Sequence, residues 1–201
     1  MIGVPLRRVF FERQPDLVAH ELIGSFVVVR GPNFTQYARL VEVEAYGGLE
    51  DPASHAYRGP TPRSSIMFGP AGFLYVYLSY GVHWCMNVVT GVEGTPSAVL
   101  LRAAELYVDA HGSLSPSNPA VLLRGPGNLT RGLGITGLDN GVDCCHSGAR
   151  VSFREAPRGL AQFEVGRSKR IGLSRAKERP SRYFAIHHPA VSATRSSARP
   201  Q

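Results

Sequence analysis

The clearest alternation of apolar and polar side chains runs from residue 39 to residue 46. A two-residue period is typical of a β-strand with one buried face. We therefore expect a strand here whose polar face ends in an aromatic ring, although a lone carboxylate on a strand is more often simply solvated. The apolar face would carry Val41, Val43 and Ala45, and the polar face Glu42, Glu44 and Tyr46.

A second pattern, between residues 72 and 89, predicts a β-hairpin. Apolar and aromatic runs flank Tyr80-Gly81, and glycine permits the tight turn between them. The turn would place Tyr80 at an exposed tip, where an aromatic ring can act as a wedge between stacked bases, although an exposed tyrosine can also be accidental. Trp84 and Met86 are expected in the core rather than in a binding site.

Weaker patterns predict the remaining elements. A helix would begin at Pro15 and end at Gly24, and loops rich in glycine, proline or serine are expected at 47–63 and 113–119. The buried side of the helix would consist of Leu17, Val18, Leu22 and Ile23, and a short helix would follow Arg124. Further strands are expected at 26–30, 98–102, 151–153, 162–165, 168–172 and 181–186.

Aromatic rings and polar groups are unusually dense between residues 40 and 89. A solvated surface does not need so many rings beside polar heads, whereas a pocket for a flat, polar ligand does. His55 taken alone would more often be a hydrogen-bonded structural histidine than a catalytic one. The stretch holds Glu44, His55, Asn87 and the tyrosines Tyr46, Tyr57, Tyr75, Tyr77 and Tyr80.

The totals describe one globular domain with a basic end. The 201 residues are 43% hydrophobic, enough to bury a core and too apolar for wholesale disorder. From Arg150 onward twelve Arg and Lys stand against three Glu, a balance of +9, whereas the preceding residues carry ten Arg and twelve acids, a balance of −2. This distribution favours phosphate binding by the last quarter, although genome composition can also favour arginine over lysine.

Cysteine usage and the absence of targeting signals indicate a compartment. Three cysteines, Cys85, Cys144 and Cys145, form no disulfide framework and no zinc spacing, so we expect inert thiols in a reducing environment. The first eight residues lack the apolar core of a signal peptide, and no apolar run could span a membrane. We therefore expect a soluble cytoplasmic protein with no membrane partner.

Several motifs occur together in a fixed order, and together they resemble the alkyladenine (3-methyladenine) DNA glycosylase family of the mammalian type, which also has bacterial members. The resemblance extends from about Leu22 to Ser192. The stretch after Glu105 and the pair His187-His188 depart from the family pattern, so no phosphate contacts are transferred to them. The matching motifs are VEVEAYGGLEDPASHAYRG at 41–59, TPRSSIMFGPAGFLYVYLSYGVHWCMNVV at 61–89, AVLLRAAE at 98–105, RGPGNLTRGLGI at 124–135, and KRIGL, RYF and PAVS in the last quarter.

The resemblance implies an α+β fold, with a single glycosylase domain at residues 1–193 and a flexible basic tail at 194–201. The domain would be built around a curved, mainly antiparallel sheet with short flanking helices. It also implies a monomeric, nucleoid-associated enzyme that binds double-stranded DNA containing damaged purines, hydrolyses their N-glycosidic bonds and leaves abasic sites, with no metal and no cofactor.

Residue by residue, the resemblance implies a complete site. Glu44 would be the general base that activates water, and Arg102 would help to hold it. Tyr46, His55 and Tyr77 would form the walls of the purine pocket. Asn87 would clash with the amino group of guanine, and Tyr80 would fill the gap left by the flipped nucleotide.

The chemistry is consistent with those residue types. Flipping a nucleotide costs roughly a few kcal/mol, and stacking on aromatic rings returns on the order of 1–3 kcal/mol per base. The stacking energy exceeds the cost of flipping by only a small amount, so binding alone distinguishes damaged from normal purines poorly. The weakened N-glycosidic bond of the lesion must therefore supply part of the selectivity. A covalent lyase needs an amine, and Lys169 and Lys177 lie far from the pocket in sequence, which favours hydrolysis.

Three other interpretations are open at this point. A non-catalytic nucleic-acid-binding module would explain Tyr80 and the arginines but gives Glu44 no purpose. A glycosidase of nucleosides or sugars could use Glu42 and Glu44, because side chains two apart on a strand lie roughly 7 Å apart, within the range of paired carboxylates. A metal hydrolase is least favoured, because the seven histidines are dispersed apart from His187-His188.

Overall fold

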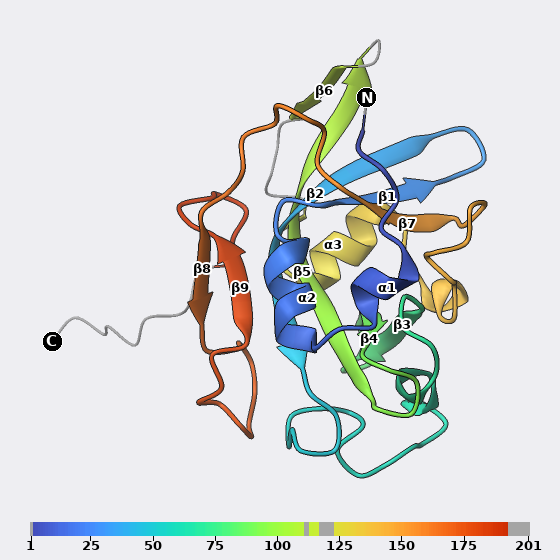
Figure 1. Ribbon diagram of the computed structural model, residues 1–201, viewed down its shortest axis with the longest axis vertical. Helices are drawn as coiled ribbons and strands as arrows, with labels where there is room; N and C mark the ends of the chain where they lie inside the picture. Colours follow the sequence, from blue (N-terminus) through green and yellow to red (C-terminus); the bar gives the residue numbers. More distant parts are fainter. Residues whose placement is uncertain (1, 111–112, 117–122, 193–201) are drawn as a thin grey trace, which may run out of the picture.

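The computed structural model describes residues 2–110, 113–116 and 123–192. A single strongly curved β-sheet dominates it, and every strand pair is antiparallel (Figure 1). The fold class expected from the resemblance is thereby confirmed. The strands are β1 (Phe26–Arg30), β2 (Thr35–Tyr46), β3 (Leu74–Ser79), β4 (His83–Thr90), β5 (Ser97–Ala110), β6 (Ser113–Pro116), β7 (Val151–Arg154), β8 (Val165–Ser168) and β9 (Arg182–Ala185).

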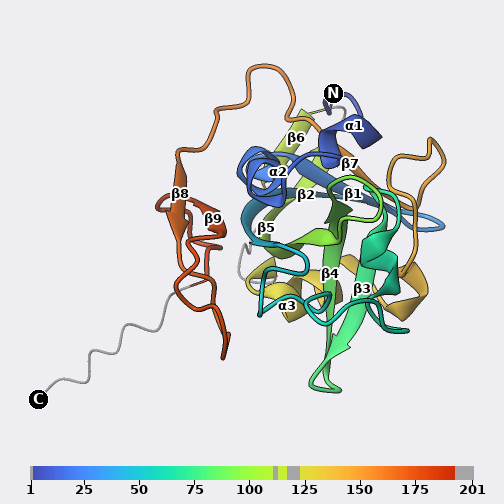
Figure 2. The same ribbon diagram turned by 60° about the horizontal axis from the view of Figure 1, so that its bottom comes forward.

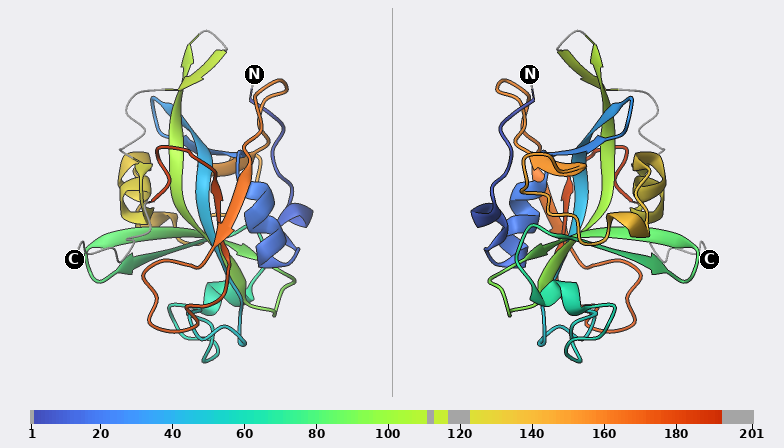
Figure 3. Two further views of the ribbon diagram at one scale, coloured as in Figure 1. Left: turned by 90° about the vertical axis from the view of Figure 1, so that its left-hand side faces the viewer. Right: turned by 90° about the vertical axis from the view of Figure 1, so that its right-hand side faces the viewer.

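Short helices flank this sheet. Figure 3 shows α1 and α2 on one side of the β2–β5 pair and α3 on the other. Pro15 opens α2 because proline lacks only an N–H that would be unpaired in the first turn anyway. The helices are α1 (Arg8–Phe11), α2 (Pro15–Leu22) and α3 (Pro126–Leu133), with 3₁₀ turns η1 (Ser65–Phe68) and η3 (Gly137–Asp139).

The long strand β2 organises the sheet. One edge pairs with β5 along most of its length. The opposite edge pairs first with β1, through residues 35–39, and then with β9, through residues 42–44. The register with β5 shifts twice between Leu40 and Val43, and such irregularities bend a strand. Beyond this bend, β9 replaces β1 at the edge of β2, beside the half of the strand that carries the polar face.

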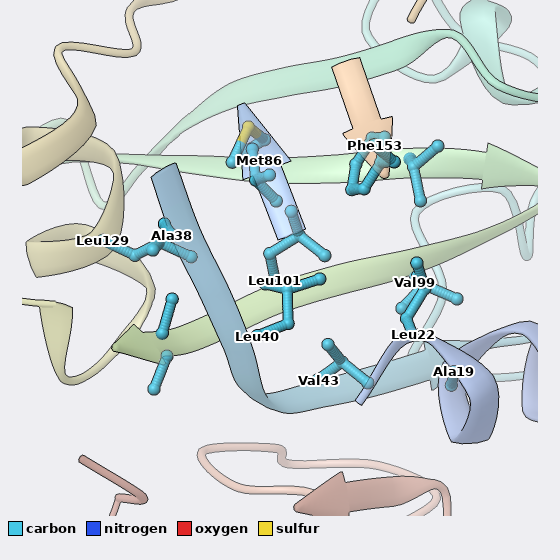
Figure 4. Close-up of a cluster of buried hydrophobic side chains, with 14 of the residues drawn as sticks. Ala19, Leu22, Ala38, Leu40, Val43, Met86, Val99, Leu101, Leu129 and Phe153 are labelled. Carbon is cyan, nitrogen blue, oxygen red and sulfur yellow. The ribbon is translucent and has the colours of Figure 1, made fainter. Parts of the chain in front are cut away.

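The core lies between the β2–β5 pair and the helices (Figure 4). Leu40 and Val43 of β2 meet Leu101 of β5, and Leu22 of α2 covers them from one side. These side chains are fully buried, and burying each of them contributes about 1.5–3 kcal/mol. The apolar face predicted for β2 therefore packs into the core.

Several predicted elements are confirmed. The strands at 26–30, 98–102, 151–153 and 181–186 exist as β1, β5, β7 and β9, and the short helix after Arg124 exists as α3. The β3–β4 hairpin turns at Tyr80-Gly81 and projects from the body with a free tip (Figure 2). Met86 is fully buried, and Trp84 is partly buried against the core.

Other predictions were wrong, each for a tertiary reason. Leu17 is 54% exposed, because α2 turns Val18, Ala19 and Leu22 toward the sheet instead. The loop expected at 113–119 begins as strand β6, which pairs with the unforeseen extension of β5.

The strand expected at 162–165 begins only at Val165, where β8 starts. The strand expected at 168–172 does not extend beyond Ser168, where β8 ends, because Ile171 directs its backbone N–H at a buried carboxylate and Gly172 has φ +76°. The proposed tail at 194–201 lies outside the described residues. In the part of the chain that the structure describes, no helix has both the length and the apolar character to cross a bilayer.

Candidate active site

A cavity of about 550 Å³ opens on one face of β3, β4 and β5, beside the end of β2. Its volume lies within the range of about 300–1,000 Å³ typical of small-molecule sites. Strand periodicity builds it, because alternate residues of each strand point into it. From the sheet these are Tyr75, Tyr77, Ser79, Cys85, Asn87, Ala98, Leu100, Arg102 and Tyr46.

The structure brings all seven predicted site residues together. Six of them line the cavity, and the seventh, Glu44, is fully buried behind its wall. The six are Tyr46, His55, Tyr77, Tyr80, Asn87 and Arg102.

Three donors orient the carboxylate of Glu44. The backbone N–H of Ile171 donates to Oε1 at 2.7 Å. The hydroxyl of Tyr46 donates to Oε2 at 2.9 Å, and Nη1 of Arg102 lies 3.2 Å from the same oxygen. All three donor residues line the cavity. A carboxylate has about four acceptor positions, so Glu44 keeps capacity to accept from a water molecule on that side.

Tyr46 is held in its protonated form. Burial, followed by the negative charge and hydrogen bond of Glu44, raises the pKa of Tyr46 well above its usual value of 10. The phenol therefore stays a donor to Glu44 at any physiological pH. The guanidinium of Arg170 lies 4.5 Å from the centroid of the Tyr46 ring and fixes its orientation.

Glu42 has a different environment, although it lies on the same strand face. Oε1 accepts from Nε of Arg102 at 2.9 Å and from Nε of Arg182 at 2.8 Å, and Oε2 accepts from the N–H of Ser192 at 2.6 Å. Burial acts to raise the pKa of Glu42, but the two arginines and the amide outweigh it and hold that pKa below its usual value.

A paired-carboxylate glycosidase needs one carboxyl group with a raised pKa to serve as general acid. Glu42 has the opposite shift, and only one of its three donors, Arg102, lines the cavity. The structure therefore argues against that interpretation and gives Glu42 the task of holding Arg102.

The aromatic side of the cavity is built around His55. Its Nδ1 lies 2.7 Å from the hydroxyl of Tyr75, and its ring centroid lies 4.6 Å from that of Tyr77. Burial and then the charge of Arg63 lower the pKa of His55 below 6.5, so the imidazole is neutral at pH 7. Tyr75 was counted among the tyrosines of this stretch, but no sequence signal assigned it to His55.

Asn87 cannot swing away from the cavity. It is 5% exposed, and its Nδ2 donates to the backbone oxygen of Tyr75 at 3.0 Å. The side chain therefore presents a fixed shape to any ligand. The neighbouring Cys85 is buried and reduced, and burial raises the pKa of its thiol.

Tyr80 occupies a position that a tyrosine does not favour. It is 94% exposed, and its φ of +50°, followed by +71° at Gly81, lies in the left-handed region. Hairpin turns of this kind favour asparagine, aspartate or glycine at the first position, and a strained non-glycine residue costs of order 1–3 kcal/mol. The backbone of the turn therefore does not itself favour a tyrosine at this exposed position.

No sequence pattern predicted the buried pair Asp51 and Arg170. The arginine donates both of its Nη groups to the carboxylate at 2.5 and 2.9 Å, and the side chains are 1% and 0% exposed. Asp51 also accepts from the N–H groups of Gly47 and Ala53. The pair therefore ties the loop after β2 to the segment that supplies Ile171.

A basic loop follows that segment at the mouth of the cavity. Ile171, Gly172 and Leu173 line the cavity, and the residues on either side expose positive side chains. These are Lys169, Arg175, Lys177 and Arg179. The basic surplus of the last quarter thus lies partly beside the site.

The chain matches the family model described as methylpurine-DNA glycosylase (MPG) over residues 9–189. It is 44% identical over 203 residues to a protein of Frankia casuarinae, with 96% of this chain and 94% of the relative covered. It is 43% identical over 188 residues to one of Bradyrhizobium diazoefficiens (90% and 88% covered) and 43% identical over 195 residues to one of Mycobacterium tuberculosis (92% of each covered). All three are named "Putative 3-methyladenine DNA glycosylase". With its fold and site geometry in agreement, the chain belongs to the methylpurine-DNA glycosylase family.

Proposed function

We propose that this protein is a monofunctional 3-methyladenine DNA glycosylase of base-excision repair. It flips a damaged purine out of duplex DNA into the cavity and hydrolyses the N-glycosidic bond with an activated water. One observation carries the proposal: a buried carboxylate, Glu44, is oriented by three donors that themselves line an aromatic cavity. Because the substrate of this enzyme would be chromosomal DNA, it would act at the nucleoid.

Glu44 supplies the chemistry in this proposal. Water attacks the anomeric carbon and gives a proton to the carboxylate, while the electron pair of the breaking C–N bond leaves with the purine. The carboxylate also stabilises the positive charge that develops on the sugar. Arg102 and the amide of Ile171 keep Glu44 in one orientation throughout, so little reorganisation is needed during the reaction.

The aromatic wall supplies binding. Tyr46, His55 and Tyr77 offer ring surfaces for a purine, and alkylation at N3 or N7 gives that purine a positive charge that aromatic faces attract by about 0.5–2 kcal/mol. The guanidinium of Arg63 lies 4.6 Å from the centroid of Tyr77, which supports the capacity of this ring to pair with a cation. Asn87 adds selectivity through a clash with the guanine amino group rather than through an attraction.

A non-catalytic DNA-binding module is the second candidate, and the burial of Glu44 speaks against it. Burying a carboxylate costs several kcal/mol unless its partners compensate. A binding surface gains nothing from a buried carboxylate beneath an aromatic cavity, whereas a glycosylase requires one.

The decisive experiment is a product assay on methylated duplex DNA. We expect wild-type protein to release free methylated purine, to leave the strand uncut at the abasic site and to form no adduct with DNA when borohydride is added. Neither Lys169 nor Lys177 lines the cavity, so no lysine amine is positioned to form a Schiff base. Absence of free base would support the binding-module interpretation, release from nucleosides but not from duplex DNA would support the sugar glycosidase, and a trapped adduct would show lyase chemistry.

Replacing Tyr80 with alanine should slow excision from duplex DNA by roughly 10–100-fold, since an aromatic ring stacked on a base contributes on the order of 1–3 kcal/mol. Excision from a single-stranded lesion should change little, because no stack needs to be filled there. Single-turnover rates on the two substrates measure the difference. Tyr57→Ala is the matched control, because Tyr57 is also exposed but lies outside the cavity; equal losses for both variants would remove Tyr80 from the wedge role.

A further inference from the structure

A second hollow, of about 290 Å³, lies between the β4 strand of the hairpin and α3. His83 and Trp84 of β4 line the hollow, whereas the next residue of the strand, Cys85, lines the cavity. We call this hollow the α3 groove, because α3 and its following turn form the far wall. Its lining residues are Val82, His83, Trp84, Gly127, Asn128, Thr130, Arg131, Gly134, Ile135 and Thr136.

The walls of the α3 groove are locked to the hairpin. The hydroxyl of Thr130 donates to the backbone oxygen of Trp84 at 2.8 Å. A Cβ on Gly127 would lie 3.0 Å from the His83 side chain, and one on Gly137 would lie 2.6 Å from the Trp84 ring. These two glycines therefore pack directly against the side chains of the hairpin, so the groove keeps a fixed position relative to the hairpin tip. Trp84 pairs with Leu78, only two residues before Tyr80.

The surface of the groove combines apolar and positive groups. Val82 and Leu138 are 68% and 94% exposed beside it. Arg131 is exposed, and its Nη2 donates to Oδ1 of Asn128 at 2.9 Å, which orients the guanidinium. Among the described residues no carboxylate pairs with Arg131. The nearby acid, Asp139, is buried and paired with Arg150.

We propose that the α3 groove binds the sugar–phosphate backbone of the undamaged strand opposite the lesion, with Arg131 contacting a phosphate. A hairpin inserted into a groove of duplex DNA has one DNA strand on each side. If one face of the hairpin holds the everted nucleotide, its other face meets the opposite strand. An oriented arginine without a carboxylate partner suits phosphate oxygens, and the exposed apolar residues suit sugar rings.

This inference rests on the proposed function, because it takes the hairpin tip as the element that enters the duplex. It goes further by assigning a surface that only double-stranded DNA can use. The protein should therefore bind a duplex with more phosphate contacts than a single strand of the same sequence. The volume of the groove is below the roughly 300 Å³ of the smallest typical ligand pockets. A shallow groove of this size is suited to contact with a DNA backbone that extends beyond it.

The test measures how the dissociation constant depends on salt for two oligonucleotides that carry a stable abasic-site analogue, one duplex and one single-stranded. Each phosphate contact adds about 0.9 to the slope of log K against log salt for duplex DNA. For Arg131→Ala we expect the duplex slope to fall by about 0.9 and the single-strand slope to stay unchanged. Arg131→Lys should restore the duplex slope, because it restores the charge.

Arg7→Ala is the matched control. Arg7 is exposed and directly precedes α1, and α1 lies on the side of the sheet away from α3 (Figure 3). Replacing Arg7 should change neither slope. Alanine is at least as good a helix former as arginine, and equal melting temperatures confirm that α3 is intact in the variant.

Two results would overturn the inference: an unchanged duplex slope for Arg131→Ala, or an equal fall on duplex and single strand. The second would place Arg131 on the lesion strand. Failure of the proposed function would look different, since wild type would release no methylated base whatever the salt slopes show.

Discussion

Replacing Glu44 with glutamine is expected to slow single-turnover excision of methylated purines from duplex DNA by about 10²–10⁴-fold, the usual contribution of a general base. Glutamine has nearly the same shape, but it cannot take a proton from water or stabilise a cationic sugar. The glutamine oxygen can still accept from the N–H of Ile171, while its NH₂ group takes the place of the oxygen that accepts from Tyr46. The site therefore keeps its shape, and affinity for lesion-containing DNA should stay within a few-fold. Rates under enzyme excess and a binding titration separate the two effects.

Glu50→Gln provides the control for this experiment. Glu50 is an exposed glutamate on the loop after β2 and lies outside the cavity lining, so its replacement should leave the excision rate unchanged. If Glu44→Gln cleaved within a few-fold of wild type, Glu44 would not be the base. If it lost DNA binding as well, the residue would serve the structure of the site rather than its chemistry.

Replacing Arg170 with alanine is expected to lower the free energy of unfolding by about 3–5 kcal/mol, because the change leaves the buried carboxylate of Asp51 without its counter-charge. Excision should fall too, since the adjacent Ile171 would lose the position from which it donates to Glu44. Urea unfolding measures the first effect. Lys169→Ala is the matched control: its ion pair with Glu178 is exposed, and such pairs contribute about 0–1 kcal/mol.

The same pair gives this stability difference a defined pH dependence. Burial acts to raise the pKa of Asp51, but Arg170 outweighs it and the pKa is lowered from 3.8. A lowered pKa in the folded state contributes stability that is fully present above the unfolded pKa and is lost as the pH falls through the folded value. The stability that wild type gains from the ionised Asp51 should therefore be fully present above about pH 4 and be lost below it, so the gap between wild type and Arg170→Ala should narrow in acid. A gap under about 1 kcal/mol at neutral pH would show that solvent reaches the pair.

Local patterns were sufficient where one strand or one turn decided the outcome. The two-residue alternation of β2 predicted which side chains enter the core, and Gly81 predicted the turn that exposes Tyr80. The resemblance named seven candidate site residues. Six of them line the cavity, and Glu44 is buried behind its wall. These features depend on a few neighbouring residues, so periodicity and turn preference describe them well.

Local patterns failed where partners come from distant segments. Glu42 and Glu44 look alike in the sequence, yet one is enclosed by Arg182 and Ser192 and the other faces donors at the cavity. The pair that departs from the family pattern also meets a matching motif in space, since Nε2 of His188 lies 3.6 Å from Oε2 of Glu105. The spacing of residues along the sequence predicts neither of these contacts.

The sequence by itself determined the alternating strand, the exposed tyrosine, the basic last quarter and, through its motifs, the family. Only the tertiary structure decided which acid is held by donors that line the cavity, which arginine neutralises Asp51 and where the second groove lies. The physical reason is that side-chain periodicity specifies the face on which a residue lies. The pKa and role of a buried charge depend instead on the donors that the folded chain brings from as far as 150 residues away.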